Sequence, residues 1–222
     1  MESKIIMTAD GSQTIFIPEL NECYHSRNGA ITESAHIFIN AGFRLAAQKN
    51  EALNILEVGF GTGLNALLTL IEANKTKRDV FYVGVEPDRV DKKMLTALNY
   101  PSLMAIPNSS DYFYKIHNTT SQRQLSDYFT LSIHEEKIQE ITTENSFFHL
   151  VYFDAFAPAI CPELWNEAVF QKLWNSLTND GILVTYSCKG EVKRALKAVG
   201  FSIEKLPGPP GKREFIRATK KR

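Results

Sequence analysis

The chain has 222 residues, 44% of them hydrophobic and 23% charged, with a formal net charge of zero. Such a chain is most simply one globular domain with a sizeable core. No stretch is long enough to span a membrane and the first residues lack a signal-peptide pattern, so we expect a cytoplasmic protein without membrane partners.

The cysteines and charges narrow the expected partners. Cys23, Cys161 and Cys188 include no C-x-x-C pair, so neither a disulfide framework nor a metal site is expected. Residues 189–222 contain eleven Lys or Arg against three Glu, although the whole chain is neutral. This basic end suggests an anionic partner, and the alternative is an ordinary solvated surface.

The N-terminal part, residues 1–50, is predicted to be an extension of the core fold. Residues 8–20 alternate weakly and predict a short hairpin. Residues 32–43 predict a helix capped by Thr32 or Ser34. A polar segment before the first core strand can form a lid over a ligand, or it can serve only as a packing extension.

A glycine-rich stretch follows. The apolar run 55–58 meets Gly59, Gly61 and Gly63, and a helical pattern then begins at Leu64. Glycine adopts left-handed dihedrals without strain and lets the backbone approach a ligand closely. The free N–H groups at the start of the helix favour a carboxylate or a phosphate. A nucleoside cofactor is therefore expected, although many glycine-rich turns are only turns.

The next strand, residues 80–85, ends at Glu86, 23 residues after Gly63. An acid at about this spacing can accept the ribose hydroxyls of an adenosine-containing cofactor. The nicotinamide fingerprint is absent, and E-x-G-x-G-x-G resembles the S-adenosylmethionine loop of Rossmann-like methyltransferases. The cofactor-binding residues expected here are Glu57, Gly59, Phe60, Gly61, Thr62, Gly63, Asn65 and Glu86.

The middle of the chain is less regular. A helix is predicted from Pro87 to the stop at Tyr100-Pro101, and residues 102–128 are predicted to be a small helical insertion with one apolar side. The strand 129–133 is followed by acids and a short helix through Ile141. In Rossmann-like methyltransferases an acid after the third strand often contacts adenine, so Glu136 or its neighbour Glu135 is a candidate, with surface charge as the alternative.

The fourth core strand, residues 148–153, is continuously apolar and ends at Asp154. Such strands are covered on both faces, and ligands bind at the carboxyl edge of a parallel sheet. The remaining elements are predicted as a helix from Pro162, a turn at 179–181, a strand over 182–186, a helix over 191–199, and an antiparallel pair formed by 201–204 and 214–218.

Several separated motifs together resemble one family. GFGTGLN at 59–65, D-A-F-A-P-A-x-x-P-E-x-W at 154–165 and G-P-P-G-K-R-E at 208–214 follow the segment Y-x-S-x-N-G at 24–29. The chain is similar to the methyltransferase domain of the bacterial bifunctional enzyme that makes 5-methylaminomethyl-2-thiouridine at the tRNA wobble position. The resemblance implies one α/β domain over 1–222, with a mostly parallel seven-stranded Rossmann-like sheet and a C-terminal antiparallel hairpin.

The resemblance also implies a reaction, the transfer of methyl from S-adenosylmethionine to a 5-aminomethyl group on (2-thio)uridine in tRNA. Asp154 stands where the family has its catalytic aspartate. The flavin-dependent oxidase domain of the two-domain members has no room here, so other enzymes are expected to supply the aminomethyl group. After the third strand the family has the pattern G-D, and this chain has Glu136-Lys137 there. Glu136 could replace the acid that contacts adenine. The expected substrate-binding residues are Tyr24, Ser26, Asn28, Phe156, Pro158, Lys212 and Arg213.

An aspartate is suited to methylation of an amine. An alkylammonium has a pKa of about 10.4, so neutralising it at pH 7 costs about 4.6 kcal/mol. A carboxylate beside the amine can orient it and accept its proton. The opposing effect is that the same carboxylate stabilises the ammonium. The structural alternative for Asp154 is a capping or turn aspartate.

The basic end has a use in this interpretation, because lysines and arginines contact the phosphates of an anticodon stem. Phe156 or Tyr186 can stack on the wobble base, with core packing as the alternative. Two other functions stay open, a methyltransferase of the same fold acting on a small molecule or protein, and a non-catalytic binding subunit. The basic residues expected to contact the RNA phosphates are Lys189, Lys193, Arg194, Lys197, Lys212 and Arg213.

Overall fold

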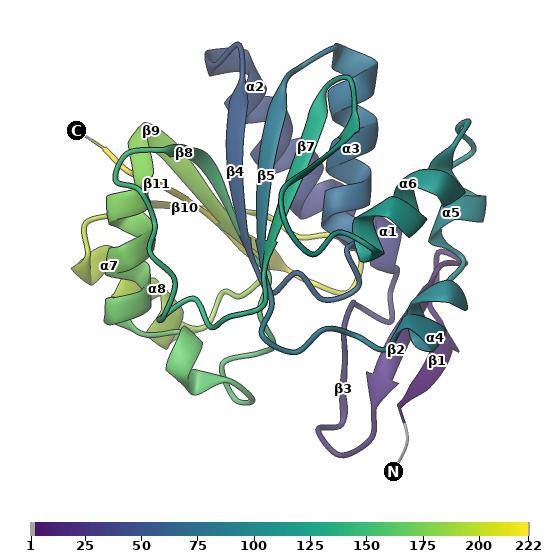
Figure 1. Cartoon of the computed structure of the whole chain (residues 1–222). Coiled ribbons are helices and arrows are strands. Elements are labelled where there is room, and N and C mark those ends of the chain that lie inside the picture. The colour runs from purple at the N-terminus through teal and green to yellow at the C-terminus, as the bar shows by residue number, and fades with distance from the viewer. Residues whose placement is uncertain (1–2, 222) are drawn as a thin grey trace.

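The computed structural model describes residues 3–221, and its centre is a large sheet with helices on both faces (Figure 1). The strands run in the order β10-β11-β9-β8-β4-β5-β7-β6. Their bounds are β4 (Leu53–Val58), β5 (Val80–Val85), β6 (Arg123–Ser126), β7 (Phe129–His134), β8 (Phe148–Phe153), β9 (Leu177–Thr185), β10 (Ser202–Pro207) and β11 (Glu214–Thr219).

The five central strands, from β9 to β7, pair in parallel, whereas β11 is antiparallel to its neighbours β9 and β10. Strand β4 shows how such a strand contributes to the cores on both faces. Leu53 and Ile55 belong to the core on one face, and Leu56 and Val58 belong to the core on the other. Successive side chains of a strand point to opposite faces, so a strand covered twice carries apolar residues on both faces. Asn54 and Glu57 are the polar exceptions in β4.

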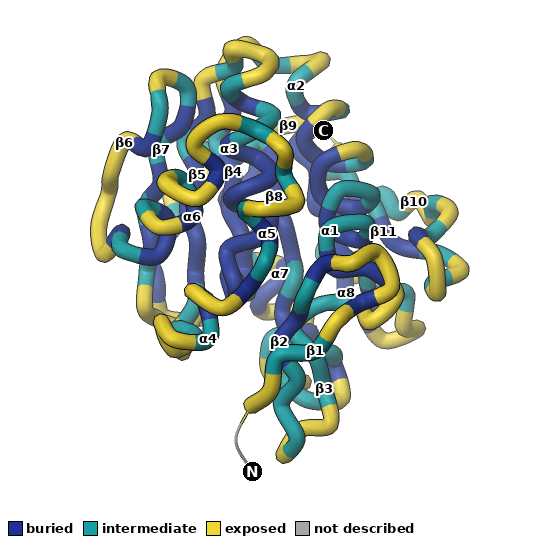
Figure 2. The backbone as a smooth tube through the Cα atoms, turned by 90° about the vertical axis from the view of Figure 1, so that its right-hand side faces the viewer, coloured by how far each residue is buried: buried dark blue, intermediate teal, exposed yellow. Residues whose placement is uncertain are grey.

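Helices cover the two faces unequally. One face carries α1 (Ala30–Ser34), the π-helix η1 (Ala35–Phe43), α2 (Arg44–Lys49), α3 (Leu64–Thr76) and α6 (Ser109–His117), whereas α7 (Glu167–Ser176) and α8 (Gly190–Ala198) cover the other. In Figure 2 the strands and inner helices are buried, and the exposed parts are mainly connecting loops. Among residues 3–221, no helix is long and apolar enough to cross a membrane, and no cluster of His, Cys, Asp or Glu could hold a metal ion.

A second, three-stranded antiparallel sheet precedes the core fold. Its strands are β1 (Lys4–Met7), β2 (Gln13–Ile17) and β3 (Glu22–Cys23). The predicted hairpin is confirmed, but it starts earlier in the chain than expected and continues into a third strand. Asn99 attaches this sheet to the body, because its side chain accepts from the Gln13 N–H and donates to the Gly11 carbonyl, both at 2.9 Å.

The class of fold is confirmed, but the large sheet has eight strands instead of seven. The additional strand, β6, comes from residues 102–128, which we expected to be only helical. Helix α6 supplies the predicted apolar side through Phe113 and Ile116. β6 was missed because it is four residues long and has one buried side chain, Leu125, so no alternating pattern stands out.

Several predicted helix boundaries are wrong. The first helix begins at Ala30 without a side-chain cap, instead of at Thr32 or Ser34. The helix expected from Pro87 is α4 (Lys92–Thr96), and α5 (Tyr100–Leu103) begins where a stop was predicted.

The same holds later in the chain. Pro162 opens the 3-10 helix η2 (Pro162–Leu164), and α7 starts at Glu167 after the capping residue Asn166. Residues 138–141 form turns instead of a helix, and residues 179–181 are an irregularity within β9 instead of a turn before it. Proline fixes its own φ, but the polar side chain that caps the first turn decides where each helix begins.

Candidate active site

The glycine turn leaves the end of β4 and passes directly against the end of β8. Gly59 has φ of +88°, and a Cβ atom there would lie 2.6 Å from the carbonyl oxygen of Asp154. Its N–H donates to the Val85 carbonyl (3.1 Å), and the N–H of Asp154 donates to the Val58 carbonyl (2.9 Å). Only glycine fits this approach, which brings the turn and Asp154 together as predicted.

Glu86 secures the turn from the neighbouring strand. It follows β5, and its Oε2 accepts a hydrogen bond from the Gly61 N–H at 3.0 Å. Burial raises the pKa of Glu86, and the hydrogen bonds from Gly61 and Asp88 oppose that shift. A carboxyl group is therefore fixed at the mouth of the turn, within reach of a ligand that lies over the glycines.

Asn65, in the first turn of α3, links two acidic groups. Its Nδ2 donates to Glu57 Oε1 (2.8 Å) and to Asp154 Oδ2 (2.9 Å). Tyr82 donates its hydroxyl to the other oxygen of Glu57 at 2.7 Å. Both amide hydrogens of Asn65 face carboxyl groups, so its Oδ1 faces away, and this buried oxygen has no partner among the described residues. A ligand that donates a hydrogen bond would satisfy it.

Asp154 is a carboxyl group held in an environment that disfavours its charge. Its pKa is raised well above the usual value, first by burial and then by the negative charge of Glu33. The hydrogen bond from Asn65 and the charge of Lys212 oppose this shift. Asp154 therefore accepts a proton more readily than an exposed aspartate does.

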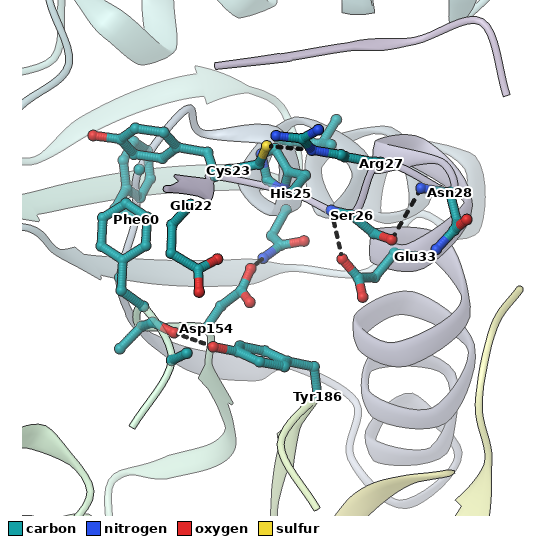
Figure 3. A pocket seen from close by; sticks show the side chains of 18 of the residues that line it. Glu22, Cys23, His25, Ser26, Arg27, Asn28, Glu33, Phe60, Asp154 and Tyr186 are labelled. Carbon is teal, nitrogen blue, oxygen red and sulfur yellow. Dashed lines mark hydrogen bonds between the residues drawn. The ribbon is translucent and has the colours of Figure 1, made fainter. Parts of the chain in front are cut away.

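A cavity of about 470 Å³ lies over the glycine turn, within the size range of small-molecule sites. It brings together most of the residues predicted for the site, from the N-terminal segment to the C-terminal hairpin (Figure 3). The predicted residues that line it are Tyr24, Ser26, Asn28, Gly59, Phe60, Gly61, Asn65, Glu86, Asp154, Phe156 and Lys212.

Other predicted residues do not line the cavity. Glu57 acts through Asn65, Thr62 Oγ1 is hydrogen-bonded to His25 Nε2 (2.7 Å), and Gly63 caps α3 with φ of +70°. Pro158 is buried within its loop and Arg213 is exposed.

Glu136 is exposed and does not line the cavity, so its contact with adenine stays a prediction. Its neighbour Glu135 lies 3.7 Å from Arg89 and is also exposed. Neither acid therefore has a place in the lining of the cavity described here.

Sequence reasoning missed two acids in the cavity, Glu22 and Glu33. Glu33 is 8% exposed, and its Oε2 accepts from the Ser26 N–H at 3.0 Å. Its Oε1 lies 2.5 Å from Lys212 Nζ. The sequence predicts Thr32-Glu33-Ser34 only as a helix start, and an acid in the first turn of a helix is ordinary, so no local signal marks Glu33 as part of the site.

The N-terminal segment and the C-terminal hairpin meet over the cavity. Besides the Glu33–Lys212 ion pair, His36 Nε2 donates to the Pro207 carbonyl at 2.8 Å. A Cβ atom on Gly211 would overlap the side chain of Asn28. Residues 21–33 and 208–213 are together called the cover.

Comparisons with known proteins agree with this geometry. A family described as S-adenosyl-L-methionine-dependent methyltransferase matches residues 104–221. The tRNA 5-methylaminomethyl-2-thiouridine biosynthesis bifunctional protein MnmC of Aromatoleum aromaticum is 31% identical, over 97% of this chain and 35% of that protein. The protein of the same name from Magnetococcus marinus is 29% identical, over 96% and 34%. The chain thus spans about a third of the length of these relatives.

Two solved structures have a fold similar to that of this chain. The crystal structure of MNMC2 from Aquifex aeolicus has a TM-score of 0.84 and 25% identity, and covers 99% of this chain and 71% of that one. Spermidine synthase from Thermotoga maritima, at 14% identity and a TM-score of 0.53 over 99% and 72%, shares the fold. Because the family match extends over more than half of the sequence, the chain belongs to the S-adenosyl-L-methionine-dependent methyltransferases.

Proposed function

We propose that this methyltransferase N-methylates the 5-aminomethyl group of (2-thio)uridine at the wobble position of tRNA, giving 5-methylaminomethyl-(2-thio)uridine. The observation that carries the proposal is the position of Asp154, which lines the cavity beside the glycine turn and whose pKa is raised. The relatives named for this tRNA modification are similar to the chain over nearly its whole length.

The residues of the glycine turn fit S-adenosylmethionine. Gly59 and Gly61 line the cavity, Glu86 presents a carboxyl group for the ribose hydroxyls, and Asn65 offers an unpartnered acceptor for the amino-acid end. When bound, the cofactor supplies a methyl group on a positively charged sulfur, which is a good leaving group. The protein's task is then to present a neutral amine in line with that methyl group.

Asp154 is suited to take the proton of the amine. Its raised pKa brings it closer to the pKa of about 10.4 of an alkylammonium, so the proton transfer is less unfavourable than to an ordinary aspartate. Asn65 keeps the carboxyl group in place and is itself held by Glu57, whose second oxygen is bound to Tyr82. Glu57 therefore acts as a positioning residue behind the site.

The proposed tRNA surface is the basic end of the chain. Lys205 and Arg217 are paired with Glu214 and Glu204, so they contribute little free charge. Helix α8 begins four residues after Tyr186, which lines the cavity, so its basic first turns lie near the cavity. Among residues 3–221, no carboxylate lies within salt-bridge distance of Lys189, Lys193, Arg194, Lys197 or Arg213.

The cover and two aromatic residues complete the proposal. Residues 21–28 line the cavity above the glycine turn, which favours a lid over a packing extension. Phe156 packs edge-on to Tyr24, with ring centroids 5.0 Å apart, and both rings line the cavity. Phe156 can therefore stack on an extruded wobble base. The primary amine of the substrate must come from an upstream tRNA-modifying reaction, because methyl transfer converts a primary amine into a secondary one and introduces no nitrogen.

The test is methyl transfer from labelled S-adenosylmethionine to tRNA that carries 5-aminomethyluridine at the wobble position. The expected product is the methylaminomethyl nucleoside, identified by nucleoside mass spectrometry. The matched control is the same tRNA with unmodified uridine, which has no amine to accept the methyl group. Transfer only to metabolites or to protein would refute the proposed substrate. A protein that fails to bind S-adenosylmethionine in calorimetry would refute the proposed catalysis.

A further inference from the structure

Lys212 occupies a cation site inside the cavity. Its Nζ lies 2.5 Å from Glu33 Oε1 and 4.1 Å from the centre of the Tyr186 ring. A carboxylate combined with an aromatic face is the chemistry that binds alkylammonium groups. A lysine side chain ends in a primary alkylammonium, which is the charged form of an aminomethyl substituent. The lysine is therefore a chemical stand-in for the proposed substrate.

The two walls of this site are held independently of Lys212. The Tyr186 hydroxyl donates to the Ala155 carbonyl (2.9 Å), beside Asp154, and its ring packs edge-on to Trp165 at 5.9 Å. Glu33 is held from the other side by the N–H of Ser26. Figure 3 shows Glu33, Asp154 and Tyr186 directed toward the same space. An amine bound by Glu33 and Tyr186 would lie close to the proposed proton acceptor.

Lys212, by contrast, can leave. Its side chain is 29% exposed, whereas that of Glu33 is 11% exposed. The backbone of its loop is fixed by hydrogen bonds from Lys212 N–H to the Pro209 carbonyl and from Gly208 N–H to the Arg213 carbonyl. The flexible four-carbon stem can swing to solvent without moving this loop.

We propose that Glu33 and Tyr186 form the subsite that receives the cationic amine of the substrate, and that Lys212 fills this subsite until the substrate displaces it. This proposal rests on the proposed function, because it assigns the part of the substrate that the cavity recognises. It makes Glu33 the residue that selects an aminomethyl group over a neutral substituent of similar size. Asp154 then takes the proton from an amine that Glu33 has already oriented.

The experiment compares binding of two anticodon stem-loop RNAs that differ only in the wobble residue, 5-aminomethyluridine or 5-hydroxymethyluridine. The ratio of the two dissociation constants measures recognition of the cation, and general RNA affinity cancels. We expect Glu33→Gln to lower the preference for the aminomethyl RNA about tenfold or more, because a charge-assisted hydrogen bond is removed. Lys212→Met should raise the preference, since the competing ammonium is removed.

Two controls make the comparison specific. Lys205→Met removes another lysine of the same hairpin, one that pairs with Glu214, and should leave the ratio unchanged. Tyr186→Phe keeps the ring and should retain the preference, whereas Tyr186→Leu should lower it. If Glu33→Gln does not fold, as judged by circular dichroism, Tyr186→Leu tests the same subsite.

The outcomes separate the two proposals. Wild-type protein that does not methylate aminomethyl tRNA overturns the proposed function. Wild-type protein that methylates this tRNA while Glu33→Gln and Tyr186→Leu keep the wild-type ratio overturns only the subsite. A weaker preference of Lys212→Met for the aminomethyl RNA would also overturn the subsite, because the lysine would then assist binding of the amine instead of competing with it.

Discussion

The two sides of the cavity are built in different ways. The glycine turn and Asp154 are joined by backbone hydrogen bonds between parallel strands and by the buried Asn65. The cover is joined mainly by side chains, above all by the ion pair between the partly exposed Lys212 and the buried Glu33. A backbone-held wall keeps one geometry, whereas an ion pair can exchange one partner for another. The first wall suits a cofactor that is always the same, and the second suits a substrate that must enter and leave.

The largest expected effect comes from Asp154→Ala. Loss of a proton acceptor at the reacting amine should reduce turnover by about 10²–10⁴-fold. Cofactor affinity measured by calorimetry should change little, because the glycine turn keeps its backbone contacts. Asp154→Asn is the matched variant, since it retains the size of the side chain and the hydrogen bonding but not the basicity. Near wild-type turnover in both variants would show that Asp154 is not the proton acceptor.

The second effect tests the rigidity of the side of the cavity formed by the glycine turn and Asp154, called the glycine wall. Gly59→Ala places a methyl group 2.6 Å from the Asp154 carbonyl at a positive φ, so we expect about 1–3 kcal/mol of destabilisation and at least tenfold weaker cofactor binding. Gly11→Ala is the control, because Gly11 has φ of +80° and nothing within 4 Å of the added Cβ atom. It reproduces the backbone strain without the clash. Equal effects of the two substitutions on cofactor affinity would contradict the close approach.

A third prediction concerns acid sensitivity behind the glycine wall. Burial lowers the pKa of His117 from 6.5 to about 3, and its ring packs against Phe113. Below pH 6.5 the unfolded chain therefore binds a proton that the folded chain does not. Stability is full above pH 6.5 and falls by about 1.4 kcal/mol per pH unit toward pH 3 from this residue alone.

Urea unfolding at pH 7.5 and pH 5.0 measures this effect. The loss of stability between the two values should be smaller in His117→Leu than in the wild type. An unchanged loss would mean that His117 is not the buried group responsible. Measuring the variant and the wild type at the same two pH values removes the contribution of every other titrating group.

The smallest effects should come from the exposed basic residues. Replacing Lys193 and Arg194 with Ala should weaken tRNA binding modestly and reduce the slope of log affinity against log salt by about 0.7–0.9 for each phosphate that the protein no longer neutralises. Replacing Lys205, which is already paired with Glu214, should change the slope less. Equal slopes for the wild type and the double variant would show that Lys193 and Arg194 do not contact RNA phosphates.

The glycine wall could be predicted because its signals are local. Ile55 to Asn65 encode a strand, a turn and the start of a helix within a few residues, and Asp154 directly follows a continuously apolar strand. Parallel pairing then brings the two together at the same edge of the sheet. Glu86 was found for the same reason, because its spacing from the turn reflects one strand–helix–strand unit.

The cover was only partly predictable because its contacts join distant parts of the chain. Tyr24, Ser26, Asn28 and Lys212 were expected from motif resemblance, but nothing in the sequence pairs Glu33 with Lys212. β6 was missed for lack of alternation. Helix starts at Lys92 and Glu167 depend on the caps Asp91 and Asn166, which carry weaker signals than the nearby prolines.

The contact between His36 and Pro207 joins residues 171 positions apart. Closing so large a loop is entropically unfavourable until the chain between the two ends is already ordered. The contact between the N-terminal segment and the C-terminal hairpin should therefore form late in folding, after the strands that hold the glycine turn. A partly folded chain would contain a nucleoside cradle before it contained any means of choosing what to methylate.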